Sequence, residues 1–207
     1  MAAFITFEGG EGSGKSLQAR RLYRALTRAG RPALLLHEPG GTPLGERVGR
    51  LLKWTREVEV SPVSEVLLFN VSRHQLVESV IRPALQDGQV VICDRFADST
   101  VAYQGYGRGL DPRLVTTINE VATAGLKPDL TVLLDMPVPE GLARISHRQR
   151  DRFEGEDVSF HERVRAGYLE MARAEPERWL VVDGQQPKQR VAAVVRRRVE
   201  RLLAGEA

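Results

Sequence analysis

A glycine-rich segment near the amino terminus constrains the fold more than any other part of the chain. Residues 9–16 read Gly-Gly-Glu-Gly-Ser-Gly-Lys-Ser and fit the pattern G-x-x-x-x-G-K-[ST]. A short apolar run, Phe4–Phe7, precedes this segment, and a helical pattern with Leu17, Leu22 and Leu26 follows it. The order of strand, glycine loop and helix predicts a phosphate-binding loop. The alternative is a glycine-rich turn with an incidental lysine.

The residue types of this loop match the chemistry of phosphate binding. Glycines let backbone N–H groups point inward at phosphate oxygens, and the following helix adds the positive end of its dipole. Lys15 brings a charge to the β- and γ-phosphates, and the Ser16 hydroxyl suits Mg²⁺. The expected phosphate site consists of Gly9, Gly10, Glu11, Gly12, Ser13, Gly14, Lys15 and Ser16.

Apolar runs rich in branched residues alternate with helical patterns from one end of the chain to the other. Such runs are typical of strands buried on both faces. We expect five strands, at Phe4–Phe7, Ala33–Leu36, Val90–Cys93, Leu130–Leu134 and Trp179–Val182. One helix is expected at about Ser61–Leu85, with Ser61 as N-cap and Pro62 at N1, and another at about Asp157–Ala174. A third is expected near the carboxyl terminus, where an apolar stripe is formed by Val191, Val194, Val195, Val199 and Leu202.

This alternation predicts an α/β fold with a mostly parallel five-stranded sheet and helices on both faces, the three-layer architecture of P-loop NTPases. The chain has 207 residues and no linker, repeat or low-complexity segment, so one domain over residues 1–207 is expected. In such sheets ligands bind beyond the carboxyl ends of the strands. We expect the candidate site residues to gather at that edge.

Composition limits the class of partner. The net charge of +3 is too small to separate a site for anionic small molecules from a nucleic-acid surface. The arginines at 196, 197, 198 and 201 are interpreted as a solvated helix face, so no nucleic-acid partner is expected.

No apolar stretch approaches the roughly 18 residues that span a bilayer, and the start lacks a leader pattern, which predicts a cytoplasmic protein without a membrane partner. Cys93, the one cysteine, is interpreted as a buried filler.

An acidic residue ends the third apolar run. Asp94 follows Val90–Cys93, which is the form expected of an aspartate that orients Mg²⁺ beside a phosphate loop. Asp135 ends the fourth run and competes for this role. We favour Asp94 because Arg95 follows it at once and a polar cluster comes next, made of Asp98, Ser99, Thr100, Tyr103 and Gln104.

Two further groups of residues suggest nucleotide chemistry. Phe69 and Arg73 are four apart on an expected helix, where a ring and a guanidinium fork side by side can stack on a flat base and bond its edge. The alternative places Phe69 in the core and Arg73 in a surface ion pair. Arginines at 144, 148, 150 and 152 predict a lid at about residues 145–156 that closes over transferring phosphates, and the alternative is a solvated, charged hairpin.

Taken in order, these motifs resemble the bacterial type of the thymidylate kinase family, within the P-loop nucleoside-monophosphate kinases. The resemblance covers nearly the whole chain. The matching segments are Phe7–Ser16, Glu38-Pro39-Gly40-Gly41-Thr42, Asp94-Arg95-Phe96, Ser99-Thr100 with Ala102–Gly105, and Asp151–Glu154 in the lid.

The resemblance implies that the γ-phosphoryl group of ATP is transferred to dTMP with Mg²⁺ present, giving dTDP and ADP. The acceptor is already an anionic oxygen, so catalysis needs positioning and charge neutralisation rather than a strong base. It also implies that Gly9–Ser16 hold ATP, that Ser16 and Asp94 help to hold the metal, and that Arg144 stacks on adenine beside the loop Gly184–Pro187. A homodimer is implied as well.

On the acceptor side, the resemblance implies a dTMP site made of Glu11, Phe69, Arg73, Arg95, Thr100, Tyr103 and Gln104. Arg95 would bind the 5′-phosphate, Phe69 would stack on thymine and Arg73 would bond its O4. Glu11 would meet the 3′-hydroxyl, and Tyr103 would crowd the 2′ position.

The chain also departs from the family pattern. Some members carry an arginine in the phosphate loop where this chain has Gly12, so the catalytic charge must come from the lid, with Arg150 as first choice and Arg148 as second. His37 stands where many members have an arginine before Glu38, which puts a phosphate contact from that position in doubt.

Two other functions remain open at this point. One is a P-loop kinase for another nucleoside monophosphate. The other is a nucleotide-dependent switch, although the chain has no Asn-Lys-x-Asp guanine motif.

Overall fold

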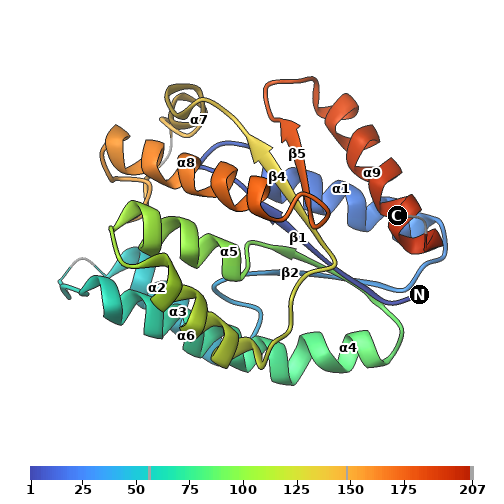
Figure 1. Ribbon diagram of the computed structural model, residues 1–207, viewed down its shortest axis with the longest axis horizontal. Helices are drawn as coiled ribbons and strands as arrows, with labels where there is room; N and C mark the ends of the chain where they lie inside the picture. The colour runs from blue at the N-terminus through green and yellow to red at the C-terminus, as the bar shows by residue number, and fades with distance from the viewer. Residues whose placement is uncertain (56, 148, 206–207) are drawn as a thin grey trace.

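The computed structural model describes residues 1–55, 57–147 and 149–205 (Figure 1). A five-stranded sheet lies at its centre, with the order β2-β3-β1-β4-β5, and every neighbouring pair is parallel. The strands are β1 (Ala3–Glu8), β2 (Ala33–His37), β3 (Val90–Asp94), β4 (Leu130–Asp135) and β5 (Trp179–Asp183). All five expected strands are confirmed, and each extends one residue further at its carboxyl end.

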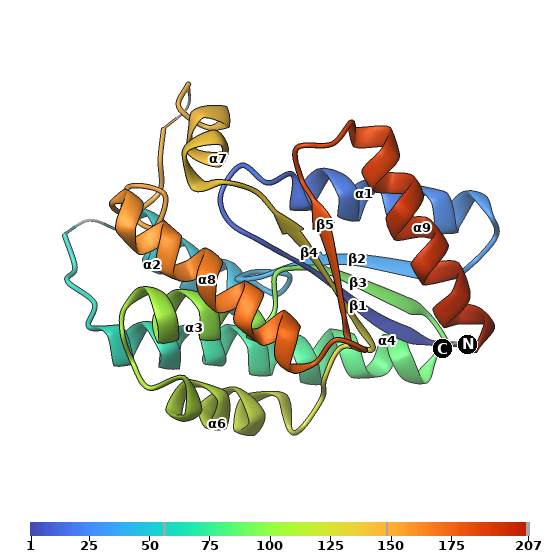
Figure 2. The same ribbon diagram turned by 45° about the horizontal axis from the view of Figure 1, so that its top comes forward.

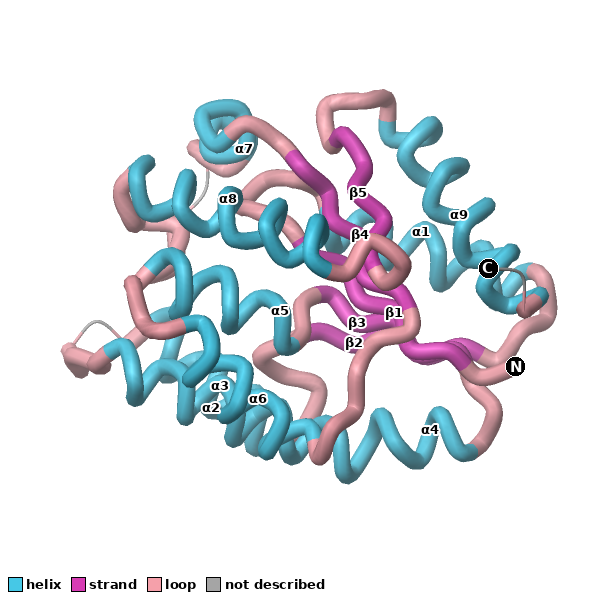
Figure 3. The backbone as a smooth tube through the Cα atoms, viewed as in Figure 1, coloured by secondary structure: helices cyan, strands magenta, loops and turns pink. Residues whose placement is uncertain are grey.

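Helices cover both faces of the sheet (Figure 2). α1 (Lys15–Arg28) and α9 (Lys188–Ala204) lie together on one face, where Leu22, Leu26, Val191 and Val195 pack on alternate residues of the strands. The other face carries α2 (Pro43–Trp54), α3 (Pro62–Leu76), α4 (Arg82–Gln86), α5 (Ala97–Thr100), α6 (Pro112–Thr123) and α8 (Val158–Ala174), whereas α7 (Val138–Arg144) lies beyond the carboxyl end of β4, beside α8. The sheet is therefore enclosed by helices, as the tube view also shows (Figure 3).

The alternation of side chains along β1 and β3 explains the two cores. Ile5 and Ile92 belong to the cluster under α1 and α9, whereas Phe4, Val91 and Cys93 belong to the cluster under α3 and α4. Successive residues of a strand point to opposite faces, so continuous apolar runs bury both faces of the sheet. Cys93 is fully buried, in agreement with its interpretation as a filler.

The long helix expected at 61–85 begins as expected and is then interrupted. The Ser61 side chain accepts from the Ser64 N–H, a cap worth about 1 kcal/mol, with Pro62 in the first turn. The helix widens into a π-helical segment, η1 (Val77–Ile81), before α4. Pro83 has no N–H to offer the carbonyl one turn earlier, which accounts for the change in pattern.

α8 and α9 lie where expected, although Val194 and Leu202 of the expected stripe are only half-buried and Leu203, which was not expected, is buried. Asp157 caps α8 by accepting from the Phe160 N–H at 2.6 Å, and α9 buries Val191, Val195, Val199 and Leu203. A second π-helical segment, η2 (Val101–Gly107), follows α5. In the part of the chain that the structure describes, no helix is long and apolar enough to cross a membrane.

Candidate active site

The phosphate loop turns tightly between β1 and α1. Gly9, Gly12 and Gly14 have φ of 139°, 68° and 95°, in the region that side chains disfavour. Lys15 begins α1, and its Nζ donates to the Gly10 carbonyl at 2.8 Å. Burial, with help from the charge of Arg95, lowers the pKa of Lys15 to about 8. The loop thus holds a buried cation at the amino-terminal end of a helix, an arrangement suited to phosphate.

Position 12 of the loop has no room for a side chain. A Cβ on Gly12 would overlap the carbonyl group of Gly141 in α7, and a Cβ on Gly141 would overlap the Glu11 carbonyl oxygen. The loop and α7 therefore pack backbone against backbone. This contact leaves no room for an arginine side chain at position 12.

Arg95, Glu11 and Tyr103 form one charged cluster at the ends of β1 and β3. The Arg95 Nη2 donates to Glu11 Oε1 at 2.7 Å and to the Tyr103 hydroxyl at 3.0 Å. The Tyr103 hydroxyl donates to the same Glu11 oxygen at 2.5 Å. Burial by itself would raise the pKa of Glu11, but the charges of Arg95 and Lys15 and the bond from Tyr103 together lower it to about 2. Glu11 is therefore a carboxylate throughout the physiological range.

The two candidate metal aspartates have different surroundings. Asp135 receives two hydrogen bonds from Arg165, from Nε at 2.7 Å and from Nη2 at 2.9 Å. Asp94 instead lines the central cavity together with Ser16. These contacts favour Asp94 over Asp135 as the metal residue.

The oxygen donors present fit Mg²⁺ bound with a nucleotide. The carboxylate of Asp94 and the hydroxyl of Ser16 are hard donors, and Mg²⁺ is usually bound by one or two carboxylates plus substrate phosphates. Within residues 1–55, 57–147 and 149–205, no group of three or more His, Cys, Asp or Glu could hold a metal by itself. The donor chemistry of Asp94 and Ser16 thus fits a Mg²⁺ ion that phosphates help to hold.

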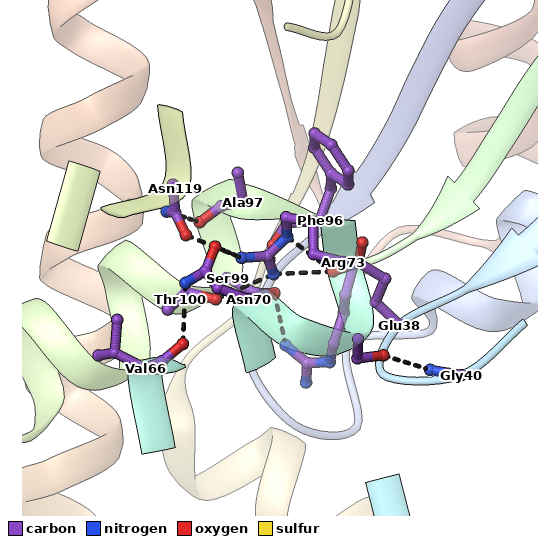
Figure 4. A network of polar contacts seen from close by, with 12 residues as sticks. Glu38, Gly40, Val66, Asn70, Arg73, Phe96, Ala97, Ser99, Thr100 and Asn119 are labelled. Carbon is purple, nitrogen blue, oxygen red and sulfur yellow. Dashed lines mark hydrogen bonds and ion pairs between the residues drawn. The ribbon is translucent and has the colours of Figure 1, made fainter. Parts of the chain in front are cut away.

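Arg73 lies in a dense network rather than on the surface (Figure 4). Its side chain is 1% exposed and pairs with Glu38, with Nη2 and Oε2 2.7 Å apart. Its five hydrogen bonds run from Nε to Glu38, from Nη1 to Asn70 and Asn119, and from Nη2 to the Phe96 carbonyl and the Thr100 hydroxyl. The surface ion pair considered from the sequence is therefore wrong for Arg73.

Phe69 lies beside this network and reaches the cavity. Its ring is half-buried and tilted against that of Phe153, with centroids 5.6 Å apart. Phe69 is therefore neither a fully buried core residue nor a solvent-facing one. Phe153 in turn meets Tyr103 edge to face, with centroids 6.3 Å apart.

The end of the expected lid is fixed against α3 by a buried carboxylate. Glu65, 2% exposed on α3, accepts from Arg152 Nη2 at 2.6 Å and from Gln104 Nε2 at 3.0 Å. Arg108 completes the group, with Nε 3.3 Å from Glu65 Oε2. Arg152, Phe153 and Gln104 therefore hold a common position against α3.

The other lid residues lie further out. Arg144 is exposed, and its Nη1 donates to the Gly12 and Gly184 carbonyls at 3.4 Å each. These bonds link Arg144 to the loop at 184–187, and its stacking on adenine stays a prediction. Arg150 is half-buried near His161, whose pKa is lowered mainly by burial and in small part by the Arg150 charge. Arg148 lies outside the described residues.

A single cavity of about 510 Å³ brings most of the expected site residues together. Residues from the phosphate loop and from the groups expected to bind the metal and dTMP line it: Glu11, Lys15, Ser16, Phe69, Arg73, Asp94, Arg95, Thr100, Tyr103 and Gln104. The lining does not include the expected residues Gly9, Gly10, Gly12, Ser13, Gly14, Arg144 and Arg150. His37 also lines the cavity, and its Nε2 lies 3.3 Å from Glu46 Oε1.

Sequence reasoning gave no role to Glu38, Glu65 or Phe153. Glu38 stands in a recognised motif, but its partner Arg73 is 35 residues away. Glu65 reads as an ordinary acidic residue in the first turn of a helix. The only signal that pointed to Phe153 was its place in the lid motif Asp151–Glu154.

Comparisons with known proteins agree on one family. The family model for thymidylate kinase matches residues 7–195. A thymidylate kinase from Dehalococcoides mccartyi is 51% identical over 203 residues, covering 98% of each chain, and one from Deinococcus radiodurans is 50% identical, covering 93% of each. The crystal structure of thymidylate kinase from Ehrlichia chaffeensis has a TM-score of 0.76 to this chain at 33% identity, covering 98% of both.

Proposed function

The chain belongs to the thymidylate kinase family, and on this premise we propose how it phosphorylates dTMP with ATP. One observation carries the proposal: residues of the phosphate loop line the same cavity as Phe69, Arg73 and Arg95. Two nucleotides that meet there bring their phosphates together between Lys15 and Arg95. The whole chain, residues 1–207, acts as one P-loop kinase domain with the lid at about 145–156.

The donor side is built from the phosphate loop. Gly9–Ser16 surround the phosphates of ATP with backbone N–H groups, and Lys15 adds its charge. Arg144 packs on the adenine, since it already joins the loop to Gly184. Ser16 and Asp94 hold Mg²⁺, which neutralises phosphate charge when bound.

The acceptor side orients dTMP. Arg95 binds the 5′-phosphate, which competes with Glu11 for the same guanidinium. Tyr103 limits the space at the 2′ position, and Phe69 stacks on the thymine. Arg73 reaches O4 with an N–H that gives up one of its five hydrogen bonds in the network, beside Thr100, which it contacts, and Gln104, which lines the same cavity.

The lid supplies the remaining charge. Arg150 stabilises the equatorial oxygens of the transferring phosphoryl group, with Arg148 as the second candidate. The acceptor oxygen is already anionic, so no residue is needed to remove a proton.

We also propose a homodimer that acts in the cytoplasm. α3 exposes a stripe of apolar residues, Val63, Leu67 and Val71, between 44% and 51% exposed. Residues four apart share one helix face, so a second copy of the chain can bury them together. Sedimentation equilibrium of the purified protein measures this state directly.

One assay tests the proposed reaction. Each nucleoside monophosphate is supplied in turn with ATP and Mg²⁺, and ADP formation is read by a coupled enzyme. We expect the highest kcat/KM with dTMP. Preference for another monophosphate would assign a different acceptor, and slow ATP hydrolysis without any acceptor effect would indicate a nucleotide-dependent switch.

A further inference from the structure

Glu8 is a buried carboxylate at the carboxyl end of β1 that the proposed mechanism does not use. Its side chain is fully buried. Oε1 accepts from the Phe96 N–H at 2.8 Å. Oε2 accepts from the Ser99 hydroxyl at 2.5 Å and from the Tyr168 hydroxyl at 2.8 Å. All of these donors lie next to Arg95 in the sequence or in space.

The first set of contacts bears on the Arg95 backbone. Arg95 has φ of 71°, a left-handed conformation that costs a non-glycine residue about 1–2 kcal/mol. The Arg95 N–H donates to the Phe7 carbonyl at 3.0 Å, and the next N–H, of Phe96, donates to Glu8. Both peptide groups that flank Arg95 are therefore held by the last two residues of β1, which keeps the strained conformation in place.

The second set of contacts bears on the Arg95 side chain. Its Nη1 donates to the Ser99 hydroxyl at 3.2 Å and to the Tyr168 hydroxyl at 3.4 Å. Because both hydroxyls donate their own protons to Glu8, their lone pairs face the guanidinium. Glu8 thus sets the direction of two hydrogen bonds that Arg95 makes, without touching Arg95 itself.

We propose that Glu8 is a positioning residue that fixes the backbone and the guanidinium of Arg95 for the acceptor phosphate. The proposal rests on the role of Arg95 given under the proposed function. A carboxylate is required because it accepts on both oxygens. A glutamine accepts from Phe96 with its oxygen, but its NH₂ group then faces the two hydroxyls and turns their protons toward the guanidinium.

The test is the kinetics of Glu8→Gln. Burial and the charge of Asp98 raise the pKa of Glu8 to about 7, so rates are measured above that pH. We expect KM for dTMP to rise about tenfold, the scale of one hydrogen bond to a charged group, while KM for ATP stays within about twofold. Tyr168→Phe removes one of the two hydroxyls while leaving Glu8 in place, and should raise KM for dTMP about threefold.

Arg95→Ala and the double variant separate the two claims. If Glu8 acts through Arg95, Glu8→Gln adds nothing to the KM for dTMP of Arg95→Ala. Suppose that Arg95→Ala raises the KM for dTMP, but Glu8→Gln and Tyr168→Phe leave it normal. This result overturns the proposed role of Glu8 and leaves that of Arg95 intact. Effects that multiply in the double variant also overturn the role of Glu8. A normal KM in Arg95→Ala overturns the proposed role of Arg95 and the inference with it.

Asp129→Asn is the matched control. Asp129 also accepts a backbone N–H of β1, that of Phe4 at 2.7 Å, but at the opposite end of the strand. The same carboxylate-to-amide change there should leave the KM for dTMP within about twofold of the unchanged protein, because it touches neither Arg95 nor its partners. An equal rise in KM in this variant would show a general effect on β1 and overturn the inference.

Discussion

The acceptor side and the lid of this protein are built differently. Arg73 and Arg95 on the acceptor side are held by buried partners from several elements, and Arg73 alone makes five hydrogen bonds. In the lid, Arg150 is half-buried, and Arg144 at its start makes two contacts of 3.4 Å. The proposed binding groups for the acceptor are therefore organised in advance, whereas the proposed catalytic arginine, Arg150, lies in a less constrained part of the lid than Arg152, which pairs with buried Glu65.

The largest expected effect tests the lid. Arg150→Ala should lower kcat about 1000-fold while changing ATP affinity little, because an arginine in this role stabilises charge that develops during transfer. Steady-state kinetics with both substrates varied give the two values. Arg173→Ala, at an exposed arginine in the last turn of α8, is the control. Unchanged turnover in Arg150→Ala would move the role to Arg148.

The next effect tests the acceptor network. Lysine at position 73 has three donors in place of five, so Arg73→Lys should lose about 4 kcal/mol of unfolding free energy as buried acceptors lose partners. Urea denaturation measures this loss. Arg196→Lys, at an exposed pair with Glu200, should change stability by less than about 0.5 kcal/mol. Equal stability of the two variants would contradict the described network.

A third prediction compares Glu8 and Glu11, three residues apart. The Glu8 pKa is raised from 4.5 to about 7, mainly by burial, so the folded state binds its proton more tightly than the unfolded state does. Glu8 therefore contributes about 3 kcal/mol to the unfolding free energy below pH 4.5. This contribution is lost as the pH rises from 4.5 through 7. In Glu8→Gln, the unfolding free energy should therefore depend less on pH between 4.5 and 7.

Glu11 should show the opposite sign. Its pKa is lowered to about 2 because Arg95 and Lys15 outweigh the effect of burial. The stability that it contributes is present above 4.5 and is lost as the pH falls toward 2. In Glu11→Gln, the unfolding free energy should therefore no longer fall in this way as the pH drops below 4.5. Its slope against pH between 4.5 and 7 should stay unchanged. A slope change in the same window as Glu8→Gln would contradict the two pKa shifts.

The smallest expected effect on stability concerns the backbone contact between the phosphate loop and α7. Gly12→Ala places a Cβ against Gly141 at a φ of 68°, so it should cost about 2 kcal/mol of unfolding free energy. Gly10→Ala has open space and should cost less than half as much. Thermal unfolding of the two variants provides the comparison, and equal costs would show that α7 moves aside.

Much of the fold follows from local pattern. The five apolar runs become the five strands because a parallel sheet covered on both faces needs continuous apolar strands. Ser61 and Asp157 cap their helices through bonds within three residues, which a sequence pattern can predict. The π-helical segment at 77–81 was not expected, although Pro83 marks the place.

What the sequence by itself determined is the phosphate loop, the order of strands and helices, and the family, because these depend on neighbouring residues. Tertiary structure alone decided the partners of the buried charges. Glu38 meets Arg73, Glu65 meets Arg152 and Glu8 meets Tyr168 across 35, 87 and 160 residues of chain. A buried charge must find a partner in the interior, and only the packed fold brings residues so far apart in the chain within reach.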